Sequence, residues 1–503
     1  MKRILAAAVA AVAMCASADW VRVGTVQVAD FARQGDAASR LGTFMGNPLA
    51  AAGMAAVIAD MPTIKFFGPM REKSSMVFPL FFDGDRFAKD PVDALNSWEF
   101  AVLYPMSDTK DAFLARHPGS SEKDGVIAVK GDAFDAKDKD STTYVVFSED
   151  GRWAGASDKP EQAKAALKEI AHAEKPLDGD VVRLRIGAKA FKVFDAAIKK
   201  GLKCCEAAKC PIDPGVVKVV ESMRSFSCGL RVSDSGIDIR GSVKFADGSE
   251  LASCGQVPLA ADPLAFAGRG AISASARADG VWACTPFSDS EWNDVLAICG
   301  KYGLDLSRFI LREKGSGFER FTLDFGAIRE FAKAQDGKNG KKAKIDGEKI
   351  RDELKKRFAS RKSVGKSPAY SGAMGLKGFE SQWTVAERFA ATLPEAAKVN
   401  PSCVGFFSIS SIVAAVAKEL LAFAPEEQRQ VMSAVVAQLA KESKCGTAGM
   451  CWPKKGAQKF FLRISADECR TIGSFASTAM MLGVMSNGSS DSSSLLDDDD
   501  DDD

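Results

Sequence analysis

The chain sets out one series of strands and helices twice, and this repetition constrains its fold more than any single motif does. The strand-like runs 100–105 (FAVLYP) and 321–326 (FTLDFG) are each followed by a helix-like stretch. Further pairs keep the same order. The strand and helix that begin at Asp180 correspond to those that begin at Ser402, and Cys228 corresponds to Cys445. Chance matches between apolar runs would not stay in order, so the sequence predicts an internal duplication.

Within each predicted half, the apolar pattern changes between a period of two and a period of 3.6, typical of strands and helices in alternation. Hairpin-like segments occupy 145–154 and 230–245, and the second turns at 234–236 (Asp-Ser-Gly). Hairpins imply antiparallel pairing. The sequence therefore predicts an α+β fold of two related halves, 19–255 and 256–485, each a mainly antiparallel sheet with helices packed on one face.

Length and charge limit the protein class. A chain of 503 residues exceeds the size that one hydrophobic core supports, and 46% hydrophobic with 26% charged residues is ordinary for a globular protein. The formal net charge of +1 gives no overall electrostatic argument for nucleic acid as a partner.

The first 18 residues have the pattern of a signal peptide. Lys2 and Arg3 precede an apolar run, and 16–18 (Ala-Ser-Ala) is a small-residue cleavage site. The apolar run is shorter than the roughly 20 residues that a membrane span needs. The predicted location is extracytoplasmic, periplasmic or secreted, with no transmembrane span after signal removal. The alternative is lipid attachment at Cys15, although Met14 stands where lipoprotein sequences have a small residue.

The C-terminal segment 486–503 is rich in serine and ends in seven aspartates. Such a composition cannot bury apolar surface and repels itself, so a disordered acidic tail is predicted. It would act as a solvated tail, gather Ca²⁺, or lie on a basic surface.

Eleven cysteines remain after signal removal, and an odd number leaves at least one unpaired. In an oxidising compartment, short spacings favour local disulfides. The candidates are Cys204, Cys205, Cys210, Cys445 and Cys451. Cys284, Cys299 and Cys403 lie in apolar stretches typical of buried thiols.

A basic insertion covers about 333–368, and its residues 333–366 hold 13 basic and 5 acidic residues around a predicted helix at 345–358. One interpretation is an anion-binding patch for acidic glycans or lipid headgroups, which would give weak contact with the envelope surface. The other is an exposed insertion that its charge keeps solvated. No aromatic residues are interleaved for base stacking, so nucleic acid is not predicted. The candidate patch residues are Lys341, Lys342, Lys344, Lys355, Lys356 and Arg357.

Motifs for catalysis are scarce. The only histidines, His117 and His172, are predicted at helix ends, and the chain has no His-Glu-x-x-His, Cys-x-x-Cys or Gly-x-Ser-x-Gly. No metal site, cofactor or catalytic residue is therefore predicted. Asp247 and Asp467 occupy equivalent positions in the two halves and are predicted as helix N-caps. Carboxylate pairs of hydrolases have no fixed sequence spacing, so this chemistry stays open.

The runs 99–119, 144–158 and 227–252 resemble secreted bacterial proteins built of repeated α+β modules. They describe strands and turns, so the resemblance implies a fold and an extracytoplasmic setting but no site residues. The predicted function is a non-enzymatic binding or scaffolding protein of unknown ligand or protein partner, with a ligand groove between its halves. The alternative is an extracellular hydrolase that uses a carboxylate pair.

Overall fold

The structure is a computed structural model. It describes residues 20–44, 46, 62–89, 97–133, 140–205, 219–249, 252, 271–277, 288–315, 318–336, 345–358, 369–379, 381–421, 426–439, 443–454 and 456–474. The predicted signal peptide and acidic tail lie outside these residues. The chain divides into two compact units: unit 1 is Met1–Gly42, Pro48–Gln256 and Pro453–Phe461, and unit 2 is Thr43–Asn47, Val257–Trp452 and Leu462–Asp503.

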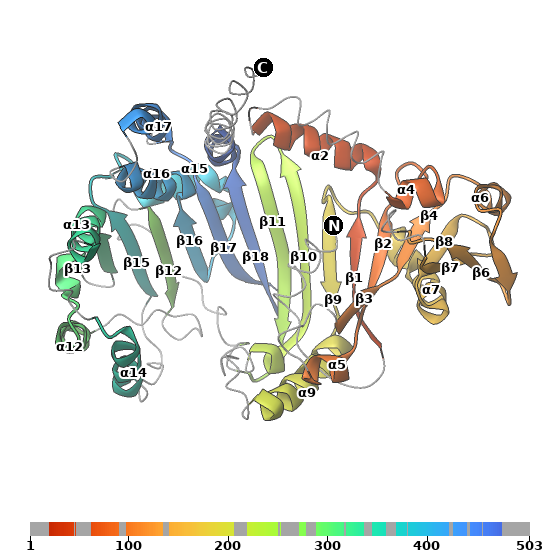
Figure 1. Cartoon of the computed structure of the whole chain (residues 1–503), viewed down its shortest axis with the longest axis horizontal. Coiled ribbons are helices and arrows are strands. Elements are labelled where there is room, and N and C mark those ends of the chain that lie inside the picture. The colour runs from red at the N-terminus through yellow and green to blue at the C-terminus, as the bar shows by residue number, and fades with distance from the viewer. Residues whose placement is uncertain are drawn as a thin grey trace, which may run out of the picture. The chain divides into compact units, whose positions relative to one another are not determined.

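Unit 1 contains an antiparallel sheet in the order β8–β4–β2–β1–β9–β10–β11 (Figure 1). A meander of β5, β6 and β7 leads into β8, and β3 pairs with β2. The bounds are β1 Val21–Val28, β2 Met76–Phe82, β3 Trp98–Phe100, β4 Val102–Pro105, β5 Ser121–Lys123, β6 Val126–Lys130, β7 Thr142–Phe147, β8 Trp153–Ser157, β9 Val182–Ile186, β10 Met223–Ser233 and β11 Gly236–Phe245.

Helices cover both faces of this sheet. Phe78 and Phe82 of β2 belong to a core shared with α9, whereas Val77 and Phe81 pack with residues of α7 and α8. All seven residues of β2 are buried. The prediction that helices lie on one face is therefore wrong for unit 1, because this strand is apolar on both sides. The helices in this part of the chain are α2 Phe31–Phe44, α4 Pro62–Phe67, α5 Gly84–Lys89, α6 Lys110–Arg116, α7 Pro160–Ala166, η2 Leu167–Glu169, α8 Ile170–Ala173 and α9 Ala188–Cys205.

Unit 2 contains a second sheet, in which β12 lies between β15 and β16 and pairs antiparallel with both (Figure 1). β16 also pairs antiparallel with β17, whereas β14 and β15 are parallel. The bounds are β12 Ile272–Arg277, β13 Ile310–Gly315, β14 Phe318–Leu323, β15 Ala369–Leu376, β16 Cys403–Phe407, β17 Thr447–Lys454 and β18 Ala457–Ser465.

Side-chain caps fix where two helices of this unit begin. Ser288 with Glu291 and Thr384 with Glu387 form capping boxes at the starts of α12 and α15. Residues 466–474 are helical after β18. The helices are α12 Asp289–Lys301, η4 Leu306–Arg308, α13 Phe325–Asp336, α14 Gly347–Phe358, α15 Val385–Thr392, η5 Pro394–Lys398, α16 Ile409–Leu420 and α17 Glu426–Leu439.

The α+β class and the mostly antiparallel pairing are confirmed. The predicted hairpins are also present, as β7–β8 and β10–β11, and the predicted polar helix at 345–358 is α14. Among the residues that the structure describes, no helix is both long and apolar enough to cross a bilayer.

Candidate functional site

A hollow of about 400 Å³ opens in unit 1 where β9 runs into α9. We call it the arginine pocket. Strands β1, β9 and β10 form its floor, and α8 and the first turn of α9 complete its wall. Its lining residues are Arg22, Val23, Gly24, Thr25, His172, Arg185, Ile186, Gly187, Lys189, Ala190, Ser225, Phe226 and Ser227.

Arg185 lies on the central strand of this floor. It is paired in register with Thr25 of β1 on one side and with Ser227 of β10 on the other. Residues directly opposite one another in neighbouring strands point to the same face of a sheet. The guanidinium therefore shares its face with two hydroxyl groups.

Strands β1 and β9 approach closely at Gly24. A Cβ atom at this position would lie 2.6 Å from the carbonyl oxygen of Arg185, so a residue with a side chain does not fit without a backbone shift. The register of β1 also shifts between Arg22 and Gly24. Such a bulge re-aims neighbouring side chains, and Arg22 is part of the pocket lining.

The lining carries basic groups without acidic ones. Arg22, His172, Arg185 and Lys189 line the pocket, and none of its described lining residues is an aspartate or glutamate. Glu169, which is buried, lies 2.5 Å from Arg22 Nη2 and 3.1 Å from His172 Nδ1. This carboxylate balances the charge of Arg22. The charges of Arg185 and Lys189 are not balanced by any described residue of the lining.

The side chains of Arg185 and Lys189 form no hydrogen bond or ion pair with any described residue. Burial, and then the like charge of Arg183, lower the pKa of Arg185. Lys189 stands in the first turn of α9, which has no acidic residue. The first turn of a helix also presents unsatisfied N–H groups and a partial positive charge. An anion in the pocket would meet two cationic side chains and this turn together.

Val23, Ile186, Ala190 and Phe226 also border the pocket. The first three are at most 3% exposed and belong to the hydrophobic core, and Phe226 packs against it, so they offer a ligand little free apolar surface. Within the described part of the chain, no group of three or more histidine, cysteine, aspartate or glutamate residues is placed to hold a metal ion.

Both histidines lie at helix ends, as predicted. His117 is the C-cap of α6, and its Nε2 is 2.9 Å from the carbonyl oxygen of Phe66. His172 lies in the short helix α8 and faces Glu169. Asp467, in contrast, is not an N-cap: the hydroxyl of Ser465 accepts the hydrogen bond from the Glu468 amide, and Asp467 lies inside the helical segment.

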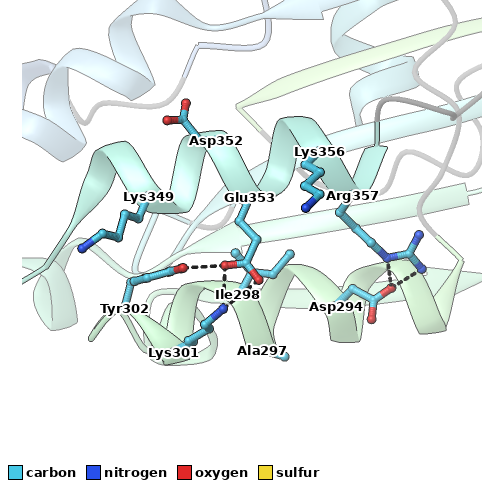
Figure 2. A pocket seen from close by; sticks show the side chains of 10 residues that line it. All are labelled: Asp294, Ala297, Ile298, Lys301, Tyr302, Lys349, Asp352, Glu353, Lys356 and Arg357. Carbon is cyan, nitrogen blue, oxygen red and sulfur yellow. Dashed lines mark hydrogen bonds and ion pairs between the residues drawn. The ribbon is translucent and has the colours of Figure 1, made fainter.

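The predicted basic patch is only partly described, and of its three described residues Arg357 forms an ion pair (Figure 2). Lys341, Lys342 and Lys344 lie outside the described residues. Lys355 is exposed on α14, and Lys356 lines a groove of about 850 Å³ between α12 and α14.

Arg357, the sixth predicted residue, binds Asp294 with Nε and Nη2 at 3.0 and 2.6 Å (Figure 2). In the same groove, Glu353 accepts from Lys301 Nζ at 2.9 Å and from the Tyr302 hydroxyl at 2.6 Å. These ion pairs within the protein neutralise most of the charged side chains that line the groove. An anion in this groove would therefore meet fewer unpaired cationic side chains than an anion in the arginine pocket.

Of the predicted disulfide cysteines, Cys445 and Cys451 have side chains that the structure describes. Cys210 and the side chains of Cys204 and Cys205 lie outside the described residues. Cys445 and Cys451 are both thiols, so a local Cys445–Cys451 disulfide is wrong. Cys451 lies four residues into the extended strand β17, at about 3.3 Å per residue, beyond the Cα separation of roughly 7 Å that a disulfide tolerates.

Sequence reasoning missed the arginine pocket altogether. The available indication was the alternation in β9, Val-Arg-Leu-Arg-Ile, in which two arginines share the face opposite to Leu184 and Ile186. An arginine three residues before a helix start, followed by Lys189, was a second indication.

No family model, curated protein or solved structure matches this chain.

Proposed function

We propose that this chain is a non-enzymatic, extracytoplasmic binding protein that holds a small anionic ligand in the arginine pocket of unit 1. The observation that carries the proposal is the side chain of Arg185, a half-buried cation on the pocket floor with no described partner. A guanidinium in such a place is stabilised when an anion binds it, because the ligand supplies charge-assisted hydrogen bonds that the protein does not.

The size of the pocket supports a small ligand. Its volume of about 400 Å³ lies in the range of small-molecule sites. The extracytoplasmic location rests on the signal-like pattern of residues 1–18.

The proposal includes a duplicated origin for the two units. The strand order β2–β1–β9–β10 in unit 1 corresponds to β15–β12–β16–β17 in unit 2, and all of these pairs are antiparallel. In both units the third strand of the series leads directly into a helix, α9 or α16. The division of the chain close to residue 256 also supports two copies of one plan.

The alternative of a carboxylate-pair hydrolase stays a prediction. The buried carboxylates that the structure describes are Glu169, Asp180, Asp238, Glu319 and Glu468. Three of them form ion pairs: Asp180 with Arg183, Glu169 with Arg22, and Glu319 with Arg312. None of these three acids lines the arginine pocket or the groove between α12 and α14.

The test is calorimetric titration of the full chain with benzoate and with phenylphosphate, two anions that carry a small apolar ring. We expect binding of at least one, weakened about 10- to 100-fold by Arg185→Gln and less by Lys189→Gln. Lys192→Gln is the matched control, because Lys192 is exposed on the same helix and does not line the pocket. Equal affinity in Arg185→Gln and the unchanged chain would refute the proposal.

A further inference from the structure

The two units differ at one corresponding place, the N-terminus of the helix that follows the third strand. In unit 1, β9 ends at Ile186 and α9 begins at Ala188; in unit 2, β16 ends at Phe407 and α16 begins at Ile409. In both cases a single residue separates strand and helix. The first turns of α9 and α16 can therefore be compared position by position.

In unit 2 a carboxylate of the chain itself occupies this place. Glu468 is fully buried, and its Oε1 and Oε2 accept hydrogen bonds from the amide and the hydroxyl of Ser410 at 2.9 and 2.8 Å. Ser410 is the second residue of α16. The charge of the buried Arg388 also favours the ionised form of Glu468. Here the helix N-terminus, a carboxylate and a guanidinium form one internal arrangement.

Among the described residues of unit 1, no carboxylate lines the corresponding place. Glu468 is the third residue after β18, whereas the third residue after β11 is Gly248, which has no side chain. Conversely, Arg185 stands three residues before α9, where unit 2 has the buried Phe406 three residues before α16. Unit 1 thus presents a guanidinium and an open helix N-terminus beside a pocket, without the acid that fills the corresponding place in unit 2.

We propose that the arginine pocket takes the carboxylate of a small molecule, in the place that the Glu468 side chain takes in unit 2. This inference rests on the proposed function and narrows its ligand class. The ligand carboxylate accepts hydrogen bonds from the fork of Arg185 and from the first turn of α9.

The comparison with unit 2 favours a carboxylate over a tetrahedral anion. The guanidinium fork by itself pairs with two oxygens of either kind of anion. The corresponding site of unit 2 is itself filled by two carboxylate oxygens, one on each donor of Ser410.

The test uses four probes with the same ring: benzoate, phenylphosphate, benzenesulfonate and the uncharged benzamide. Each is titrated calorimetrically into the full chain at one pH and ionic strength. We expect benzoate to bind at least about fivefold more tightly than the two tetrahedral anions, and benzamide to give no measurable heat. Arg185→Lys, which keeps the charge and removes the fork, should weaken the binding of benzoate.

The outcomes separate the two proposals. Tighter binding of phenylphosphate or benzenesulfonate than of benzoate would overturn the carboxylate assignment and leave the anion-binding function standing. Binding of benzamide as tight as that of benzoate, or binding of benzoate that Arg185→Gln does not weaken, would overturn both.

Discussion

Glu468 accepts hydrogen bonds from both the backbone amide and the hydroxyl group of Ser410, a residue 58 positions earlier in the chain. Two segments of unit 2 that are distant in sequence are therefore joined at the start of α16. Backbone N–H groups in the first turn of a helix have no partner within the helix, so a buried helix start needs such an acceptor.

Replacing Glu468 by alanine should destabilise the protein. The amide and the hydroxyl of Ser410 would lose their acceptor in a buried place, which costs about 2–4 kcal/mol for two such groups. Denaturant unfolding monitored by circular dichroism measures this loss. Glu348→Ala, at an exposed position of α14, is the control and should change stability by less than about 0.5 kcal/mol. An unchanged midpoint for Glu468→Ala would contradict the arrangement.

The same residue should make stability depend on pH. Burial raises the pKa of Glu468, although hydrogen bonds from Ser410 oppose the shift. The folded state then holds the proton more tightly than the unfolded state does. The free energy of unfolding should therefore fall as the pH rises from about 4.5, the ordinary value, through the raised value.

Comparison with Glu468→Gln isolates this effect. The side chain at position 468 of the variant does not titrate. The free energy of unfolding of the variant, relative to that of the unchanged chain, should therefore increase as the pH rises through that window. Glu348→Gln should follow the unchanged chain at every pH. A difference between Glu468→Gln and the unchanged chain that stays constant with pH would argue against the raised pKa.

Asp180→Ala should be among the more damaging single changes in unit 1. Asp180 is 1% exposed and accepts hydrogen bonds from Arg183 Nε at 2.9 Å and Arg240 Nε at 2.9 Å. Removing one member of a buried ion pair leaves uncompensated charge and costs about 3–5 kcal/mol. Asp178→Asn is the matched control, because the Asp178 side chain is 67% exposed and asparagine tolerates the positive φ of 47° at this position; its loss should be below about 1 kcal/mol. Equal denaturation midpoints for the two variants would be inconsistent with this network.

Gly155→Ala should loosen the packing of α7 on β8. A Cβ atom at Gly155 would lie 2.3 Å from the carbonyl oxygen of Ala163 and 3.2 Å from the Cβ of Ala166. The helix would have to move away from the sheet, at a cost of about 1–3 kcal/mol. Thermal unfolding measures the effect. Gly119→Ala, where the added atom meets nothing within 4 Å, should leave the melting temperature nearly unchanged.

Formation of a disulfide between Cys403 and Cys451 would test the register of β16 against β17. They are paired directly across the two antiparallel strands, where opposed Cα atoms are about 4.5–5.5 Å apart, within the range of a disulfide. Oxidised glutathione at pH 8 should therefore join them, the two thiols losing two protons and two electrons as the glutathione disulfide becomes two thiols. Burial and Cys403 raise the pKa of Cys451 to about 12, so the reaction should be slow.

Peptide mapping by mass spectrometry identifies the link. Cys403→Ser should abolish the linked peptide, whereas Cys299→Ser, at a buried thiol of α12, should not. A shifted register, with Cys451 opposite a different residue, would leave both thiols open to alkylation after oxidation.

The amino-acid sequence by itself determined the local structure of much of this protein. Alternating apolar residues in 182–186 and the apolar face of 409–420 defined β9 and α16, because period and capping are properties of neighbouring residues. The α+β class followed from the hairpins, since turn residues such as Gly236 act over a few positions.

Only the tertiary structure decided which charged groups have partners. Arg183 and Arg185 are two residues apart on one strand, yet the first binds Asp180 and the second lines a pocket. Arg357 looked like part of a basic patch until α12 placed Asp294 beside it. The pairing of charges depends on segments that folding brings together from distant parts of the chain. The spacing of residues along the sequence does not give the distance in space between such segments.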